Sequence, residues 1–140
     1  MIKARIIQGL TFIFGKYKEE NNLYVKSVLS DKEFEIFQGM SEYDRIHSFR
    51  LYKMVSQDTL LKDSKLYKKL ALLHDCGKFN ASLFRRMKKV LTGDKMLDRH
   101  SLDSFEKLKD INTELAILAR DHHKPSEDVM MIRFQSLDDK

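Results

Sequence analysis

The sequence predicts an all-α single domain, and three observations lead to this prediction. The chain of 140 residues contains one proline and five glycines, too few breakers for an architecture with many turns. Apolar residues recur at helical spacing through most of the chain, whereas no segment shows the strict alternation that is typical of a half-buried strand. A chain of 140 residues is also long enough for one hydrophobic core.

The first forty residues are expected to form a helical extension of this domain. Apolar residues of segment 1–15 fall at helical spacing, which predicts an amphipathic helix packed on the domain. Attachment of this helix to a membrane surface is a second interpretation of the same pattern. The run Ser-Asp-Lys-Glu at 30–33 has the pattern of a capping box, so a helix should begin after Ser30 with Phe34 and Phe37 on one face.

Residues 41–140 are expected to hold the core of the domain. Ser41 is a typical N-cap, and the helix that follows it should run to about Val55. The next helix carries a row of leucines and should end at Gly77, because glycine often follows the last helical turn. The same reasoning predicts helices near residues 81–91, 103–109 and 112–122 and from about residue 127 to the end, with a turn at 92–94 and a break at Pro125. The whole chain therefore reads as a bundle of roughly six to seven helices.

Composition and charge limit the classes of partner and the cellular compartments that the sequence allows. The net charge of +5 and the pI near 9.2 fit either an anionic partner or a lysine-rich solvated surface. No basic run interleaved with aromatic residues stands out, so specific nucleic-acid binding is not expected. Cys76 is the single cysteine, which excludes a disulfide framework within one chain and favours the cytoplasm. No apolar run is long enough for a transmembrane helix.

The pair His74-Asp75 is the most informative local feature. It directly follows the strongly apolar run Leu70-Ala71-Leu72-Leu73, so it should lie at the edge of the core. Burying an imidazole and a carboxylate there costs several kcal/mol, on the order of 2–7 for a polar group, unless they are paired or bind a metal. A helix C-terminus favours a histidine but disfavours an aspartate, whereas a metal ion accounts for both.

In this context the wider pattern resembles the HD superfamily of metal-dependent phosphohydrolases. The residues that carry the resemblance are Tyr43-Asp44-Arg45-Ile46-His47, then His74-Asp75-Cys76-Gly77-Lys78, then His122-His123, then Leu137-Asp138-Asp139. The central run is similar to the H-D-I-G-K signature of that superfamily, with cysteine in place of isoleucine. The order of the histidines and aspartates matches the dinuclear HDIG subgroup. The resemblance covers residues 41–140 and implies a helical HD-domain bundle, with one HD-type domain over residues 1–140.

The resemblance also implies a set of site residues. The implied metal ligands are His47, His74, Asp75, His100, His122, His123 and Asp138, with Asp139 as an alternative to Asp138. Asp75 would bridge two ions, and Lys78 would lie near the phosphate of the substrate; a lysine favoured by the helix dipole is an equal explanation for Lys78. The cofactor would be one or two divalent transition ions, drawn from iron, manganese, cobalt, nickel and zinc. If one ion binds, His100 and His122 would contact phosphate instead.

Several other charged residues are weaker candidates for the site. Asp121 and Glu127 flank the histidine pair and could assist proton transfer, but solvated helix positions explain them better. Arg45, Arg85, Arg86, Lys88 and Lys89 could receive further phosphates, although an ordinary basic helix face is favoured. No G-Y-P motif follows His123, which argues against the cyclic-dinucleotide phosphodiesterases, and Tyr43 stands where three-metal members carry a glutamate.

The sequence thus leads to one preferred function and two alternatives. The preferred function is an enzyme that hydrolyses a nucleotide or another small phosphoester with a metal-activated water. The first alternative is an HD module that senses a nucleotide or a protein partner without turnover. The second is a diiron oxygenase that uses the same ligands. A small phosphorylated molecule, most simply a nucleotide, is the expected partner, and a homodimer is compatible with the sequence.

Overall fold

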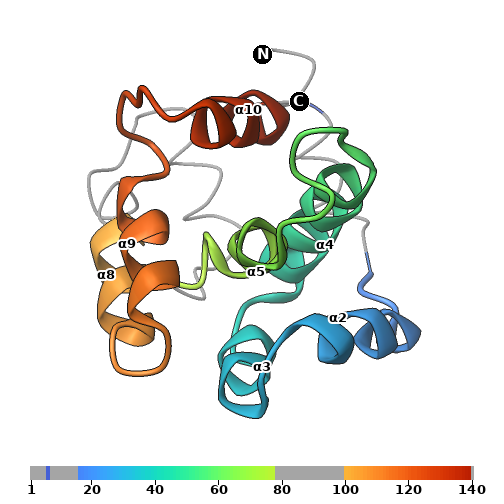
Figure 1. Cartoon of the computed structure of the whole chain (residues 1–140). Helices are drawn as coiled ribbons and strands as arrows, with labels where there is room; N and C mark the ends of the chain where they lie inside the picture. The colour runs from blue at the N-terminus through green and yellow to red at the C-terminus, as the bar shows by residue number, and fades with distance from the viewer. Residues whose placement is uncertain (1–5, 7–15, 78–99, 140) are drawn as a thin grey trace.

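The computed structural model is a bundle of helices (Figure 1). It describes residue 6 and residues 16–77 and 100–139. Within these ranges the chain forms the short 3-10 helix η1 (Glu19–Asn21) and the helices α2 (Asn22–Val28), α3 (Asp31–Gln38), α4 (Glu42–Gln57), α5 (Lys65–Leu73), α8 (His100–Leu108), α9 (Thr113–Asp121) and α10 (Val129–Asp138). The described residues contain no strand, so the predicted all-α class is confirmed.

Side-chain caps begin most of these helices. Ser30 forms a full capping box with Glu33 at the start of α3, and Ser41 accepts a hydrogen bond from the amide of Asp44 at the start of α4. Ser64, Asn112 and Asp128 cap α5, α9 and α10 in the same way. The caps predicted at Ser30 and Ser41 are therefore confirmed.

Helix α5 lies at the centre of the bundle. It packs against α2, α3, α4 and α9, and in Figure 1 it lies between α4 and the pair of α8 and α9. Leu70, Ala71, Leu72 and Leu73 are completely buried. Each buried leucine stabilises the fold by roughly 1.5–3 kcal/mol, so the apolar run before His74 anchors the whole bundle.

Two further packing relationships place the helices that follow. Helices α8 and α9 pack on each other along their length, and α10 packs on α4. Phe134 of α10 is fully buried and its ring meets Tyr67 and His74 of α5. The last helix is thus held by contacts with α4 and with α5, far from it in sequence.

One predicted boundary is wrong, because α5 ends at Leu73 and not at Gly77. The carbonyl of Ala71, which the next helical turn would use, accepts the ring Nδ1–H of His74 at 2.9 Å. Residues 74–77 form turns instead, and the amide of Cys76 reaches back only to the carbonyl of Leu73. A side chain that competes for a backbone acceptor therefore ends the helix early.

Other sequence-based expectations have different outcomes. The predicted helices at 1–15 and 81–91 and the turn at 92–94 lie outside the described residues, apart from Ile6, whose side chain is 58% exposed. The helices predicted around 112–122 and after residue 127 are confirmed as α9 and α10. The division into an extension and a core at residue 41 stays a prediction. Among the described helices, none is both long and apolar enough to cross a membrane.

Candidate metal centre

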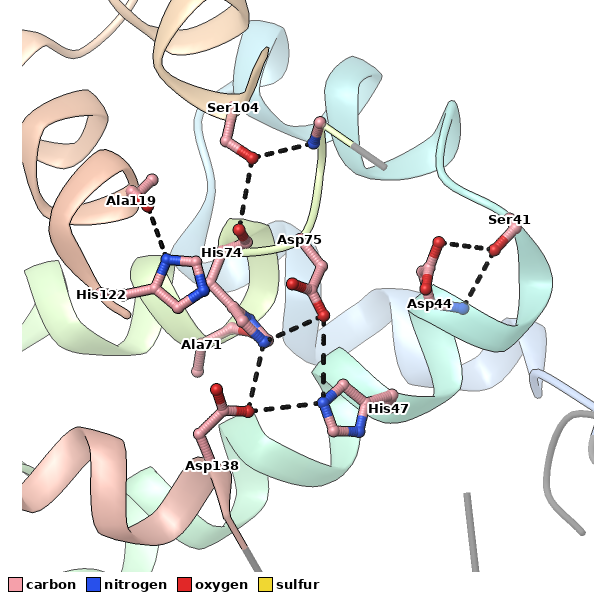
Figure 2. A network of polar contacts seen from close by, with 11 residues as sticks. Ser41, Asp44, His47, Ala71, His74, Asp75, Ser104, Ala119, His122 and Asp138 are labelled. Atoms are coloured by element: carbon pink, nitrogen blue, oxygen red, sulfur yellow. Dashed lines mark hydrogen bonds and ion pairs between the residues drawn. The ribbon is translucent and has the colours of Figure 1, made fainter. Parts of the chain in front are cut away.

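Histidines and aspartates from four helices meet in one cluster (Figure 2). His47 lies within α4, His74 is the C-cap of α5 and Asp75 follows it. His122 is the C-cap of α9, and Asp138 is the last residue of α10. Three helices therefore direct their C-terminal ends, which carry partial negative charge, toward the same place. This arrangement favours a bound cation, and such a cation would offset the unfavourable position of the Asp75 carboxylate at the end of α5.

The backbone fixes the proton on two of the imidazoles. Nδ1 of His74 is 2.9 Å from the carbonyl oxygen of Ala71, and Nδ1 of His122 is 2.5 Å from that of Ala119. A carbonyl only accepts, so Nδ1 must be the protonated nitrogen in both rings. In the neutral rings, Nε2 is then the nitrogen with a free lone pair, as a metal ligand requires.

Four ligand atoms form a closed ring around a common point (Figure 2). Nε2 of His74 lies 3.2 Å from Oδ2 of Asp75 and 3.4 Å from Oδ1 of Asp138. Nε2 of His47 lies 4.0 Å and 3.5 Å from the same two oxygens. Ligands bound at about 2.0–2.2 Å from one transition ion stand roughly 3–3.5 Å apart, so this ring is close to the size that an ion needs.

One of these four ligand atoms has no hydrogen-bond partner. Nε2 of His74 is completely buried and makes no hydrogen bond of acceptable geometry, although two carboxylate oxygens lie close to it. A lone pair that faces two anionic oxygens is unfavourable unless a positive charge lies between them. A divalent cation supplies that charge and uses the lone pair as a ligand, so the residues fit a metal ion.

The electrostatics of the cluster agree with a shared cation. Burial opposes the charge of His74, yet the carboxylates of Asp75 and Asp138 raise the pKa of this imidazole well above its usual value. Burial also opposes the charge of Asp138, but His74 and His47 hold the pKa of its carboxyl well below the usual range. Two carboxylates that favour a positive charge on His74 would favour a bound cation at the same place.

A second half of the cluster surrounds His122 and His123. Nε2 of His122 is buried, and burial together with the neighbouring His74 lowers the pKa of this imidazole to about 3, so it stays neutral. Ligand atoms of His74, Asp75 and His122 lie within 4.8 Å of one another, and so do those of His122, His123 and Asp138. Asp75 and Asp138 therefore each lie close to histidines of both halves of the cluster.

Helix α8 supports the backbone that follows His74. The hydroxyl of Ser104, fully buried, accepts from the amide of Gly77 at 2.9 Å and donates to the carbonyl of His74 at 3.3 Å. The ammonium of Lys107 donates to the carbonyl of Cys76 at 2.8 Å. A positive charge thus lies at the C-terminal end of α5, where it offsets the negative charge of Asp75.

A salt bridge places α10 and with it Asp138. Asp58, at the end of α4, is buried and accepts from Nε and Nη2 of Arg133 at 2.7 Å and 2.6 Å. Its other oxygen accepts from the amides of Leu60 and Leu61. The loop before α5 and the last helix are therefore held together by one carboxylate.

The predicted site residues separate into three groups. His47, His74, Asp75, His122, His123 and Asp138 are brought together in the cluster. His100 is the first residue of α8, but its side chain is not described, and Lys78 lies outside the described residues, as do Arg85, Arg86, Lys88 and Lys89. The remaining candidates lie outside the cluster. Asp139 is the C-cap of α10, and Asp121 forms salt bridges with Arg120 and Lys124. Glu127 is exposed, and the guanidinium of Arg45 lies over the ring of Tyr17.

Sequence reasoning missed Ser104, Lys107 and Arg133. Ser104 lies four residues before the buried Leu108, on the inward face of α8, and a small polar residue at such a position is a usable signal. No comparable signal marks Arg133, because its partner Asp58 is 75 residues away in the chain.

Comparison with known proteins agrees with this geometry. A family model described as HD domain matches residues 44–134, which is well over half of the chain. No curated protein and no solved structure matches the chain significantly.

Proposed function

The chain belongs to the HD domain family, whose members are in general metal-dependent hydrolases, and we propose that it is a phosphohydrolase that acts on a nucleotide or another small phosphoester. The observation that carries the proposal is the cluster of imidazoles and carboxylates at the ends of α5, α9 and α10. The net charge of +5 adds support, because it attracts anionic substrates.

The chain's own side chains would hold one or two divalent transition ions. His47, His74, Asp75 and Asp138 offer the ligand atoms for the first, and His122 and His123 offer those for a second, with Asp75 and Asp138 shared. When bound, such ions supply a water of lowered pKa and positive charge against the phosphoryl oxygens. Mixed nitrogen and oxygen ligands suit manganese, iron, cobalt, nickel or zinc.

The remaining contributions come from the protein. The carbonyls of Ala71 and Ala119 keep the rings of His74 and His122 in the tautomer that can bind a metal. Burial of His74 and Asp75 removes competing water from one side of the cluster, which strengthens the electrostatic interactions there. Ser104 and Lys107 hold the turn that carries Asp75. A preorganised ligand set of this kind suits a hydrolase, because little reorganisation is needed at the moment of reaction.

The experiment is a substrate panel assayed with Mn²⁺, Co²⁺, Ni²⁺ and Fe²⁺ in turn. Nucleoside mono-, di- and triphosphates and a generic phosphodiester are incubated with the wild-type protein and with Asp75→Asn. Multiple turnovers of one substrate, reduced by about two orders of magnitude in Asp75→Asn, are expected. Binding of a nucleotide at one equivalent without product would favour the sensing module instead. An iron-specific reaction that consumes oxygen would favour the oxygenase.

A further inference from the structure

Gln135 of α10 connects the last helix to the end of α9. Its amide nitrogen Nε2 donates to the carbonyl of His122 at 3.0 Å and to the carbonyl of Lys124 at 2.7 Å. An amide nitrogen carries two hydrogens, so both bonds can form at once. Gln135 thus binds the backbone carbonyls of the residues immediately before and after His123. Asp138 lies one turn further along the same helix as Gln135.

This link joins two helices whose main packing partners differ, although both also contact α5. Helix α10 packs on α4, which carries His47, whereas α9 packs on α8 and α5. Asp138 shares one ligand group with His47 and His74 and another with His122 and His123. A displacement of α9 away from α10, with α10 kept in place on α4, would therefore alter the second group and leave the first intact.

We propose that Gln135 is a positioning residue that sets the distance between Asp138 and the pair His122–His123 and thereby determines the affinity for a second metal ion. This inference rests on the proposed function, since it presumes that the cluster binds metal. It adds a named residue, outside the ligand set, that controls the occupancy of one half of the cluster. Residues that hold the ligands of a metal in place typically change its affinity by about 10–100-fold when they are removed.

Three variants separate positioning from simple electrostatics. Gln135→Ala removes both donors, and Gln135→Glu replaces the amide by a carboxylate that faces two carbonyl oxygens. Gln135→Lys restores donors to the same carbonyls. If only charge mattered, glutamate would attract the cation and tighten binding, whereas lysine would weaken it. Positioning predicts the opposite order, with lysine closest to the wild type and glutamate weakest.

The matched control is Ser136→Ala. Ser136 is exposed, is adjacent to Gln135 and bonds only to the carbonyl of Arg133 within its own helix among the contacts of the described residues. Thermal unfolding without metal is recorded for every variant, so that a general loss of stability is detected separately.

The experiment is a calorimetric titration of the full chain with Mn²⁺. We expect two binding events in the wild type. In Gln135→Ala and Gln135→Glu the second should weaken by at least about tenfold while the first stays within about threefold, and Gln135→Lys and Ser136→Ala should resemble the wild type. Equal weakening of both events, an unchanged second event, tighter binding in Gln135→Glu or a single event in the wild type would each overturn the inference. A wild type that binds no ion would refute the proposed function itself.

Discussion

The imidazole rings of His74 and His122 meet edge to face, with centroids 5.2 Å apart and planes at 88°. Each ring is the C-cap of its helix, and each has its Nδ1 within hydrogen-bond distance of a carbonyl oxygen three residues earlier in the chain. The same hydrogen bond from a histidine ring to its own helix thus occurs at the ends of α5 and α9. This bond ends the helix, sets the tautomer of the imidazole and directs its Nε2 into the cluster (Figure 2). The local backbone and the site chemistry are therefore parts of one arrangement.

Replacement of His47 tests the first metal position with little disturbance of the fold. His47 is 16% exposed, so His47→Gln should lower the melting temperature of the metal-free protein only slightly. A ligand at 100 times its Kd stabilises a protein by about 2.7 kcal/mol, so Mn²⁺ should raise the melting temperature of the wild type by more than that of His47→Gln, in which only the second position keeps its ligands. Thermal unfolding with and without Mn²⁺ measures this. Gln57→Ala, at an exposed position of the same helix, should behave like the wild type.

Loss of the Asp58–Arg133 salt bridge should weaken metal binding from a distance. Arg133→Ala leaves a buried carboxylate without its cation, which should cost about 1–2 kcal/mol because Arg133 itself is half exposed. The freed α10 should then hold Asp138 less firmly, so the affinity for the first ion should fall as well. Calorimetry and urea unfolding measure the two effects. An Arg133→Ala protein with reduced stability and unchanged metal affinity would show that α10 is placed by its apolar contacts alone.

The pair Glu33–Lys69 should make the stability depend on acid pH. Burial works to raise the pKa of Glu33, but hydrogen bonds from Lys69, Ser30 and Asn112 outweigh it and lower this pKa below its usual value. A lowered folded pKa means that the stabilisation is present above the unfolded pKa and is lost as the pH falls through the folded pKa. The wild type should therefore lose its advantage over Glu33→Gln on acidification below about pH 4.

Urea unfolding at a series of pH values checks this prediction. Near neutral pH the wild type should exceed Glu33→Gln by about 1.5–3 kcal/mol, the range for a hydrogen bond to a charged group. Glu35→Gln, at an exposed position of the same helix, should show no such difference. A gap between wild type and Glu33→Gln that is constant from pH 7 to about pH 3 would contradict the assignment.

Ser104 should support the turn that carries Asp75. Ser104→Ala removes the acceptor for the amide of Gly77 and the donor to the carbonyl of His74, both buried, so stability should fall by about 1–3 kcal/mol. Metal affinity should fall by about tenfold, because the turn then holds the carboxylate less firmly. Ser101→Ala, in the same helix and partly exposed, is the matched control. If both variants bound Mn²⁺ equally well, the turn would be held by other contacts.

The local parts of the fold could be predicted from the sequence. The cap at Ser30 needs only Glu33 three residues later, and the row of leucines in α5 shows its buried face directly. The order of histidines and aspartates along the chain indicated which side chains could be metal ligands. The cap and the row of leucines each lie within one to three helical turns, where spacing alone carries the information, whereas the order of histidines and aspartates spans residues 47–138 and was informative only through the family resemblance.

The supporting residues could not be predicted in the same way. Arg133 meets Asp58 across 75 residues, and Lys107 meets the carbonyl of Cys76 across 31. Such pairs arise from the packing of helices and leave no periodic pattern. The early end of α5 was missed for a related reason: the glycine at 77 suggested a helix end, whereas the competing bond from the ring of His74 ends the helix first.

The most direct test of the central claim is anomalous scattering from crystals grown with Mn²⁺ or Zn²⁺. The account predicts a peak about 2.0–2.2 Å from Nε2 of His47 and Nε2 of His74, with Asp75 and Asp138 as the oxygen ligands. Crystals with no peak at this position, in which Nε2 of His74 instead carries a proton shared with Asp75 or Asp138, would contradict it.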